Sequence, residues 1–469
     1  MLLDDDLPFP FSRLPFDVTE LILSRVDSRR DLISFAATSS ECKELVVPRH
    51  SEYRELRVRD KPEVWAHLCQ RPDLAKNVRR VTIQGPTTKS KPERYPTTLL
   101  DSTVLPEVDT AQTIASICQA LGNMEYLRSF TWIAACTPTD PYVESRHLYR
   151  DIFSALKTSK SLCEFKMVDT MPSPGVSVEE ENYPLWHIAN LQSLFLGHSG
   201  WWRQGLESLL TRSPNLQALD ISLSLELGAE VLASCCFPQL RQLNLNTTSS
   251  NSTADIVKFL QNHPTIQSLR WYPNAGLANS VVGHGSLPNL KCLHSHHSVA
   301  SSILADLTVP NRTIECVSQL SLDEPTLAIL DAIDTSHLRD IRIWRYSGLE
   351  SVGRFAESFP SLTRLEIPKF GIPTRDDAQN DYTIDDYILT LSKFRNLEYL
   401  VDSALWPLLL LEDSPNKINS LVCQCPNLQR LGYFDTNKLE YLDIVFHRDE
   451  HGGQASWSEE AAETEWYEA

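Results

Sequence analysis

The chain has 469 residues, more than one ordinary hydrophobic core holds, so we expect either two or three domains or one long repeat array. Hydrophobic residues make up 42% and charged residues 22%, which is typical of a folded protein and excludes wholesale disorder or a collagen-like chain. The formal net charge of −18 disfavours nucleic acids and anionic membrane surfaces as partners. With only 16 glycines, the sequence also has little material for Gly-rich phosphate loops.

The first residues, Met1 to Asp6, are acidic where a signal peptide is basic, and residues 1–12 are predicted to be flexible. No run of about 18 apolar residues predicts a membrane span. These features favour the cytoplasm, the nucleus or both. The 11 cysteines are therefore expected to be reduced, and they lack the paired spacing of zinc sites, so neither a metal nor a cofactor is expected.

Short helices are predicted before any repeat begins. The first opens at Leu14-Pro15 and carries the apolar residues Val18, Leu21, Ile22 and Val26. The second opens at Asp31-Leu32 and continues with Phe35, Ala36, Ser39 and Cys42. Pro48 closes this segment, and the chain from Tyr53 to Val58 is predicted to enter the first strand of the array.

Residues 13–56 resemble an F-box in the order of Leu14-Pro15, Asp17-Val18, Asp31-Leu32 and Pro48 followed by Tyr53-Arg54. They depart from many F-boxes at Leu45, which follows Cys42-Lys43-Glu44 where a tryptophan is common. The resemblance implies that these helices bind a Skp-type adaptor of a cullin–RING ubiquitin ligase. It also implies the adaptor contacts Leu14, Pro15, Leu21, Ile22, Val26 and Leu32. The alternative is that the helices only cap the array.

A repeated apolar triplet, with anchors at positions 1, 4 and 6, runs from Leu127/Phe130/Trp132 to Leu428/Leu431/Tyr433. In the most regular stretch the first anchors are Leu191, Leu216, Leu240, Ile266, Leu290, Val317, Leu338 and Leu362. Each interval between them lies within the roughly 20–29 residues of a leucine-rich repeat. A proline stands two positions before the first anchor in six copies: Pro214, Pro238, Pro264, Pro288, Pro360 and Pro426. Because proline interrupts a helix, each one is predicted to separate a helix from a strand.

Helical periodicity precedes several of these strands, as in Ile114, Ile117, Cys118 and Leu121. Each repeat is thus one strand and one helix, and the array resembles the leucine-rich-repeat superfamily over residues 57–445. The predicted fold is an α/β horseshoe solenoid with parallel strands on the concave face and helices outside. Residues 446–469 are predicted to be an acidic disordered tail. Two acidic clusters, Glu179–Glu181 and Asp376–Asp386, are interpreted as solvated loops rather than calcium sites.

The strand residues between the anchors are expected to face the hollow, because side chains alternate along a strand. Arginine and aromatic side chains often dominate the energetics of interfaces. The candidate substrate-binding residues are Arg270, Tyr272, Asp340, Arg342 and Trp344. His294 and His296 are also on this face, and two readings are open: a zinc-binding pair or a polar stretch of strand.

Three functions are compatible with these patterns. The first is the substrate receptor of an SCF-type ubiquitin ligase, in which the F-box binds the adaptor and the repeats capture a protein substrate. The second is a leucine-rich-repeat scaffold or inhibitor without a ligase. The third, an enzyme that uses the concave cleft, has no activating constellation to support it, so no intrinsic catalysis is expected.

Overall fold

The computed structural model describes residues 14–26, 28–59, 61–85, 92–96, 99, 110–134, 146–169, 183–199, 203–223, 228–247, 253–272, 285–304, 313–322, 324–331, 336–346, 348–367, 382–402, 405–411, 414–435, 440–448 and 456–461. The chain divides into two compact units, Met1–Leu240 and Arg241–Ala469. The predicted flexible segment 1–12, the cluster Glu179–Glu181 and the aspartates from Asp376 to Asp381 lie outside the described residues.

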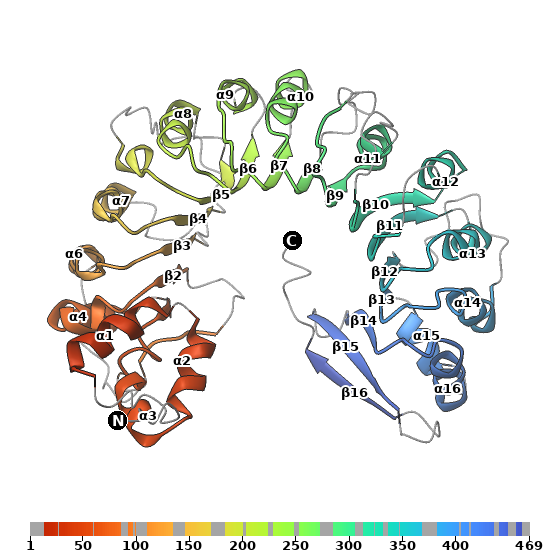
Figure 1. Ribbon diagram of the computed structural model, residues 1–469, viewed down its shortest axis with the longest axis horizontal. Helices are drawn as coiled ribbons and strands as arrows, with labels where there is room; N and C mark the ends of the chain where they lie inside the picture. Colours follow the sequence, from red (N-terminus) through yellow and green to blue (C-terminus); the bar gives the residue numbers. More distant parts are fainter. Residues whose placement is uncertain are drawn as a thin grey trace, which may run out of the picture. The chain divides into compact units, whose positions relative to one another are not determined.

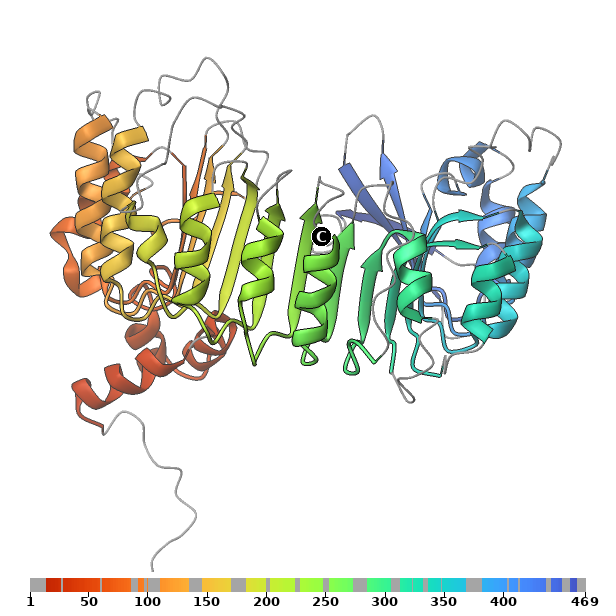
Figure 2. The same cartoon turned by 90° about the horizontal axis from the view of Figure 1, so that it is seen from above.

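Unit 1 begins with three short helices, α1 (Phe16–Arg25), α2 (Arg29–Ala36) and α3 (Ser40–Val46), at one end of its strands (Figure 2). The hydroxyls of Ser28 and Ser39 cap α2 and α3 by accepting hydrogen bonds from backbone N–H groups in their first turns. The helices enclose a small apolar core of Leu23, Leu32, Ala36 and Val46.

The rest of unit 1 alternates strands with helices. Its elements are β1 (Glu55–Val58), α4 (Pro62–Gln70), α5 (Pro72–Ala75), β2 (Arg80–Gln84), α6 (Thr110–Asn123), β3 (Ser129–Ala134), α7 (Arg146–Thr158), β4 (Glu164–Asp169), the 3-10 helix η4 (Pro184–His187), β5 (Ser193–Ser199), α8 (Arg203–Thr211), β6 (Ala218–Leu223) and α9 (Gly228–Ser234). Strands β1 to β6 pair in sequence order, and every pair is parallel. The helices after β2 lie on one side of this sheet (Figure 1).

Unit 2 repeats the same arrangement. Its elements are β7 (Gln242–Thr247), α10 (Thr253–Asn262), β8 (Ser268–Tyr272), β9 (Cys292–Ser295), α11 (His297–Leu304), β10 (Cys316–Leu322), α12 (Glu324–Asp331), β11 (Asp340–Tyr346), α13 (Leu349–Ser358), β12 (Arg364–Ile367), α14 (Ile384–Leu391), β13 (Tyr399–Asp402), α15 (Leu405–Leu411), α16 (Ser414–Gln424), β14 (Arg430–Asp435), β15 (Glu440–His447) and β16 (Ser456–Ala461). Strands β7 to β14 are parallel neighbours in sequence order. Helices α10 to α16 lie on one side of the sheet (Figure 1).

Both units have the leucine-rich-repeat-like solenoid architecture that the triplet predicts. The anchors form the core between sheet and helices, as in Leu191, Leu194 and Leu196, which are at most 1% exposed. Each strand–helix unit buries its apolar side against its neighbours in the stack, because one repeat alone is too small to form a core.

The six prolines occupy one turn position rather than simply ending a helix. In every case the N–H of the first anchor donates to the carbonyl of the residue before the proline, at 3.1–3.3 Å. This is a β-turn with proline at its second position, where the fixed φ of the ring is favourable. The residue before the proline is buried each time: Ser213, Phe237, His263, Leu287, Phe359 and Cys425. The turn therefore joins a buried residue to the first anchor.

Asparagines link neighbouring turns in unit 2. The side-chain amides of Asn289 and Asn396 donate to the carbonyls of Pro264 and Pro360, at 3.0 and 2.6 Å, and Asn427 donates to the carbonyl of Arg395, at 2.7 Å. Each asparagine stands one position before the first anchor of its repeat and reaches a turn carbonyl of the preceding repeat. These bonds satisfy turn carbonyls that the strand ladder does not reach.

The predicted register of one repeat is wrong. The triplet Val317/Leu320/Leu322 takes Val317 as the first anchor, but Val317 pairs with Ile341, which is a second anchor. The true first anchor is Ile314, which is 3% exposed and lies midway in the sequence between the first anchors Leu290 and Leu338. The misleading pattern arises from a bulge at Gln319, whose φ of 59° inserts one residue into β10.

Two repeats have a polar third anchor that is nevertheless buried. Ser295 is fully buried, and its hydroxyl donates to the carbonyl of Trp271 at 2.5 Å. Asp402 is also fully buried, and its Oδ1 accepts from the N–H of Leu405 at the start of α15. The strand–helix packing accepts polar anchors here because each finds a backbone hydrogen bond.

The C-terminal end departs from the all-parallel prediction. Strand β15 pairs antiparallel with β14, and β16 pairs antiparallel with β15. Strand β16 lies within the segment that the sequence predicts to be disordered. It is held by the ring contact of Trp457 with Trp406, whose centroids are 4.9 Å apart, and by the Tyr433 hydroxyl, which donates to Glu459 at 3.0 Å. Residues 462–469 lie outside the described part of the chain.

Candidate interaction surfaces

Helix α1 is apolar on two adjacent faces. Thr19 and Leu23 face the small helical core and are 3% exposed. Val18, Leu21 and Ile22 are 37%, 55% and 41% exposed. At about 100° of rotation per residue, these three positions fall within a single arc of roughly 100°. Phe16, at the start of the helix, is 60% exposed. Phe16 lies on the other side of the helix, where the Arg49 guanidinium is 5.6 Å from the centre of its ring. We call Val18, Leu21 and Ile22 the α1 strip.

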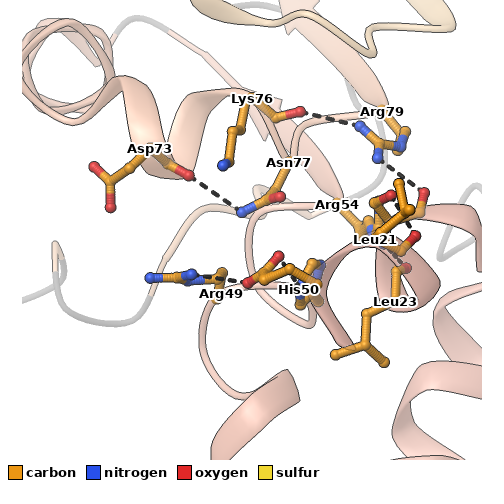
Figure 3. A network of polar contacts seen from close by, with 11 residues as sticks. Leu21, Leu23, Arg49, His50, Arg54, Asp73, Lys76, Asn77 and Arg79 are labelled. Carbon is orange, nitrogen blue, oxygen red and sulfur yellow. Dashed lines mark hydrogen bonds and ion pairs between the residues drawn. The ribbon is translucent and has the colours of Figure 1, made fainter. Parts of the chain in front are cut away.

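Polar contacts fix the opposite side of α1. Glu20 accepts from Arg49 Nη1 at 2.8 Å and is hydrogen-bonded to His50 Nε2 at 3.1 Å. Arg54 donates to the carbonyl of Leu23 (Figure 3). Arg79 donates to the carbonyl of Ser24 at 3.1 Å, so the carbonyl end of the helix is tied to the first repeat. Because these contacts hold one side, the α1 strip is the side that stays in solvent.

His50 is fully buried beneath this network. Burial, opposed by the neighbouring Glu20 carboxylate, lowers the pKa of His50 to about 4. The imidazole is therefore neutral at pH 7, and its contact with Glu20 is a hydrogen bond from Nε2–H rather than an ion pair.

This buried imidazole predicts acid sensitivity of the helical module. Unfolded His50 protonates near pH 6.5, whereas folded His50 resists protonation until about pH 4. The stabilisation that neutral, buried His50 gives the folded module is thus complete above pH 6.5. It is lost as the pH falls from 6.5 through about 4, by about 3 kcal/mol in total. Hydrogen exchange of α1 to α3 at several pH values measures this loss. His50→Gln, which retains a donor for Glu20 but does not titrate, should flatten the dependence; equal slopes in both proteins would contradict the assignment.

The predicted adaptor residues separate into three groups. Pro15, Leu21 and Ile22 are exposed, and Leu14 and Val26 are half-buried, with Val26 packed against the core. Leu32 is fully buried and is a core residue rather than a surface contact. The predicted contacts omit Val18, although the sequence places it on the apolar side of this helix.

The sheet of unit 2 presents a polar face opposite its helices. In-register pairing aligns Arg270, His294, Ser318, Arg342 and Glu366 across β8 to β12. A second row aligns Cys292, Cys316, Asp340 and Arg364 with Tyr399 of β13. We call these two rows, together with Tyr272 and Trp344 on the same face, the open face.

Ion pairs join neighbouring strands across the open face. Arg342 Nε lies 3.3 Å from Glu366 Oε2, and Arg364 Nε lies 3.7 Å from Asp340 Oδ2. The Arg364 guanidinium also stacks 4.2 Å from the centre of the Tyr399 ring. These contacts hold the arginine side chains in fixed positions, which lowers the entropy cost of binding a partner there.

Asp340 is the most buried of the predicted substrate-binding residues, at 8% exposed. Burial raises the pKa of its carboxyl, while Arg364 and Arg342 oppose the shift. Among the described residues, no donor hydrogen-bonds its Oδ1. This oxygen is buried, so Asp340 acts on the open face mainly through its ion pair with Arg364.

The other predicted residues of this face lie near one another in two groups. His294 of β9 lies between Arg270 of β8 and Ser318 of β10, and Arg342 of β11 is the next residue in this row. The Tyr272 ring meets the His296 ring edge-on, with centroids 5.4 Å apart. Trp344 is 65% exposed, more than any other large hydrophobic side chain among the described residues.

Other predicted sites have structural roles or lie outside the described residues. Asp385 pairs with Lys417, and Asp386 forms a capping box with Thr383 at the start of α14. Within the described ranges, no three His, Cys, Asp or Glu side chains are grouped to hold a metal ion. None of the described helices is both long and apolar enough to span a bilayer.

Comparison with known proteins adds little to these observations. No protein-family model matches the sequence, and no curated protein matches it. Among solved structures, one similar chain belongs to a structure described as the crystal structure of a TLR13–ssRNA13 complex. The identity is 14%, the alignment covers 59% of this chain and 43% of that chain, and the TM-score is 0.28. A likeness at this TM-score carries no argument about function, which has to come from the residues of this chain.

Proposed function

We propose that the protein is the substrate receptor of an SCF-type cullin–RING ubiquitin ligase. The helical module binds a Skp-type adaptor, and the open face of unit 2 captures a protein substrate. The chain itself supplies no catalytic group in this proposal. A leucine-rich-repeat-like fold is typical of a protein-binding scaffold, and the F-box resemblance of residues 13–56 adds the ligase.

The observation that carries the proposal is the α1 strip. Contiguous exposed apolar side chains on one helix are uncommon unless a partner covers them. Glu20 fixes the opposite side of α1 to Arg49, and Arg54 and Arg79 fix its C-terminal end to the first repeat, so the strip is already positioned for a partner. An apolar helix face that enters a partner's groove is a common recognition mode.

Binding of a purified Skp-type adaptor to the full-length chain is the direct test. A stable complex in size-exclusion chromatography, and its absence after the α1 strip is changed, would support the ligase function. No complex at micromolar concentrations would overturn it.

The second candidate is a scaffold or inhibitor without a ligase. It is favoured by the way Arg54 and Arg79 attach α1 to the first repeat, since a terminal cap needs such contacts. A chain that captures a partner on the open face but no adaptor would fit this function.

On the open face, Trp344→Ala is expected to weaken substrate capture about 30-fold, which corresponds to about 2 kcal/mol. The exposed indole has no role in the core, so folding should be unchanged. The measurement is quantitative mass spectrometry of proteins captured by the immobilised full-length chain. Tyr126→Ala, which removes a 40% exposed aromatic ring in unit 1, is the control. Equal capture by wild type and Trp344→Ala would place the substrate elsewhere.

A further inference from the structure

Two cysteines on the open face lie on neighbouring strands. Cys292 of β9 and Cys316 of β10 are register partners in a parallel pair. Adjacent strands lie about 4.8 Å apart, within the separation of roughly 4.4–6.8 Å that a disulfide requires between its two Cα atoms. Each side chain is close enough to the other to shift the pKa of its thiol. Both residues are free thiols in the structure.

The surroundings give the two thiols different properties. Cys292 is half-buried, whereas Cys316 is 8% exposed. The neighbouring Cys316 lowers the pKa of the Cys292 thiol, while Cys292 and burial raise that of Cys316. Cys292 is thus both the more accessible sulfur and the better nucleophile.

His294 lies beside the pair. Its Nε2 lies 3.8 Å from Cys316 Sγ, and its Nδ1 lies 2.8 Å from Ser318 Oγ. Burial, with the charges of Arg270 and Arg342, lowers the pKa of His294 to about 3, so the ring is neutral and leaves the pair without a neighbouring positive charge from this residue.

We propose that Cys292 and Cys316 form a reversible oxidation site that reacts with a hydroperoxide and is reduced by a small thiol. The Cys292 thiolate attacks the hydroperoxide; an S–O bond forms, the O–O bond breaks, and the leaving alkoxide or hydroxide takes a proton from water. The Cys316 sulfur then attacks the Cys292 sulfenic acid. The S–S bond forms, the S–O bond breaks, and the Cys316 thiol proton passes to the leaving hydroxide, which departs as water. The site is independent of whether α1 binds an adaptor.

Mass spectrometry of the full-length chain tests the site. The reduced protein is treated with hydrogen peroxide, blocked with N-ethylmaleimide and digested with trypsin. Cleavage after Lys291, Arg312 and Arg339 separates the two cysteines into peptides with one cysteine each. We expect these peptides to appear cross-linked, about 2 Da lighter than their sum, and to separate again with dithiothreitol. Absence of the cross-link would overturn the proposal.

Exposed cysteines elsewhere are the matched controls. Cys236 and Cys423 are both exposed, so oxidation governed by access alone would modify them first. We expect Cys292 to be oxidised at least about tenfold faster than either. In Cys316→Ser, Cys292 should accumulate as a sulfenic acid that reacts with dimedone. Faster oxidation of Cys236 or Cys423 than of Cys292 in the wild-type chain would contradict the assignment even if the variant failed to fold.

Discussion

Leu21→Ala combined with Ile22→Ala is expected to weaken binding of a Skp-type adaptor at least about 100-fold, which corresponds to roughly 3 kcal/mol. The two side chains are 55% and 41% exposed in the α1 strip, so a partner that covers the strip buries both. Isothermal titration of the purified adaptor into the full-length chain measures the loss. The circular dichroism of the chain should be unchanged, because neither side chain contributes to the helical core.

Leu389→Ala is the matched control for this pair. Leu389 is 62% exposed on α14, in unit 2, so its removal deletes a comparable apolar surface outside the α1 strip. Leu14→Ala with Pro15→Ala, at the start of α1, should also impair capture. Unchanged adaptor affinity in the Leu21/Ile22 variant would mean that the strip is not the contact.

Leu32→Ala is expected to destabilise the helical module by about 3 kcal/mol, because it empties the centre of a small core. Leu32 is fully buried and packs with Leu23, Ala36 and Val46. A core of so few side chains has a small free energy of unfolding, so it tolerates little loss. Faster hydrogen exchange in α1 to α3 measures the effect, while the strands of both units should keep their protection. Adaptor capture would fall as well, through unfolding rather than through loss of a contact.

The neighbouring residue on α2 provides the comparison. Ile33 is 41% exposed, so Ile33→Ala is expected to change stability by less than about 1 kcal/mol. If the two alanine variants lose equal protection in α1 to α3, the assignment of Leu32 to the core is wrong.

Most of the architecture could be predicted because one repeat length controls it. Anchors such as Ile266, Leu290, Leu338 and Leu362 are recognisable from spacing alone, since a strand and a helix of fixed length separate them. The error at Val317 shows the limit of the pattern. Val317, Leu320 and Leu322 satisfy the triplet. The true anchors Ile314, Val317 and Leu320 do not, because the bulge at Gln319 places one extra residue before the third anchor.

The interaction surfaces were less accessible from sequence. Periodicity places Val18, Leu21 and Leu23 on one apolar helix, but it does not say which of two adjacent apolar faces turns inward. The acidity of the C-terminal segment likewise concealed β16, whose alternation around Trp457 is the signal that was missed. The alignment of the second row of the open face could have been predicted, because its members from Cys292 to Arg364 recur at equal intervals in the sequence.

The first anchors Ile266, Leu290, Ile314, Leu338 and Leu362 follow one another at a constant repeat length. In this stretch the described residues of neighbouring strands pair with their counterparts one period away, except beside the bulge at Gln319. Removing or duplicating one whole period there keeps all anchors in phase, whereas a change of any other length shifts the downstream strands out of alignment. Whole repeats can therefore be added to or removed from this stretch. Such a change alters the length of the polar sheet face, while the packing between repeats stays the same.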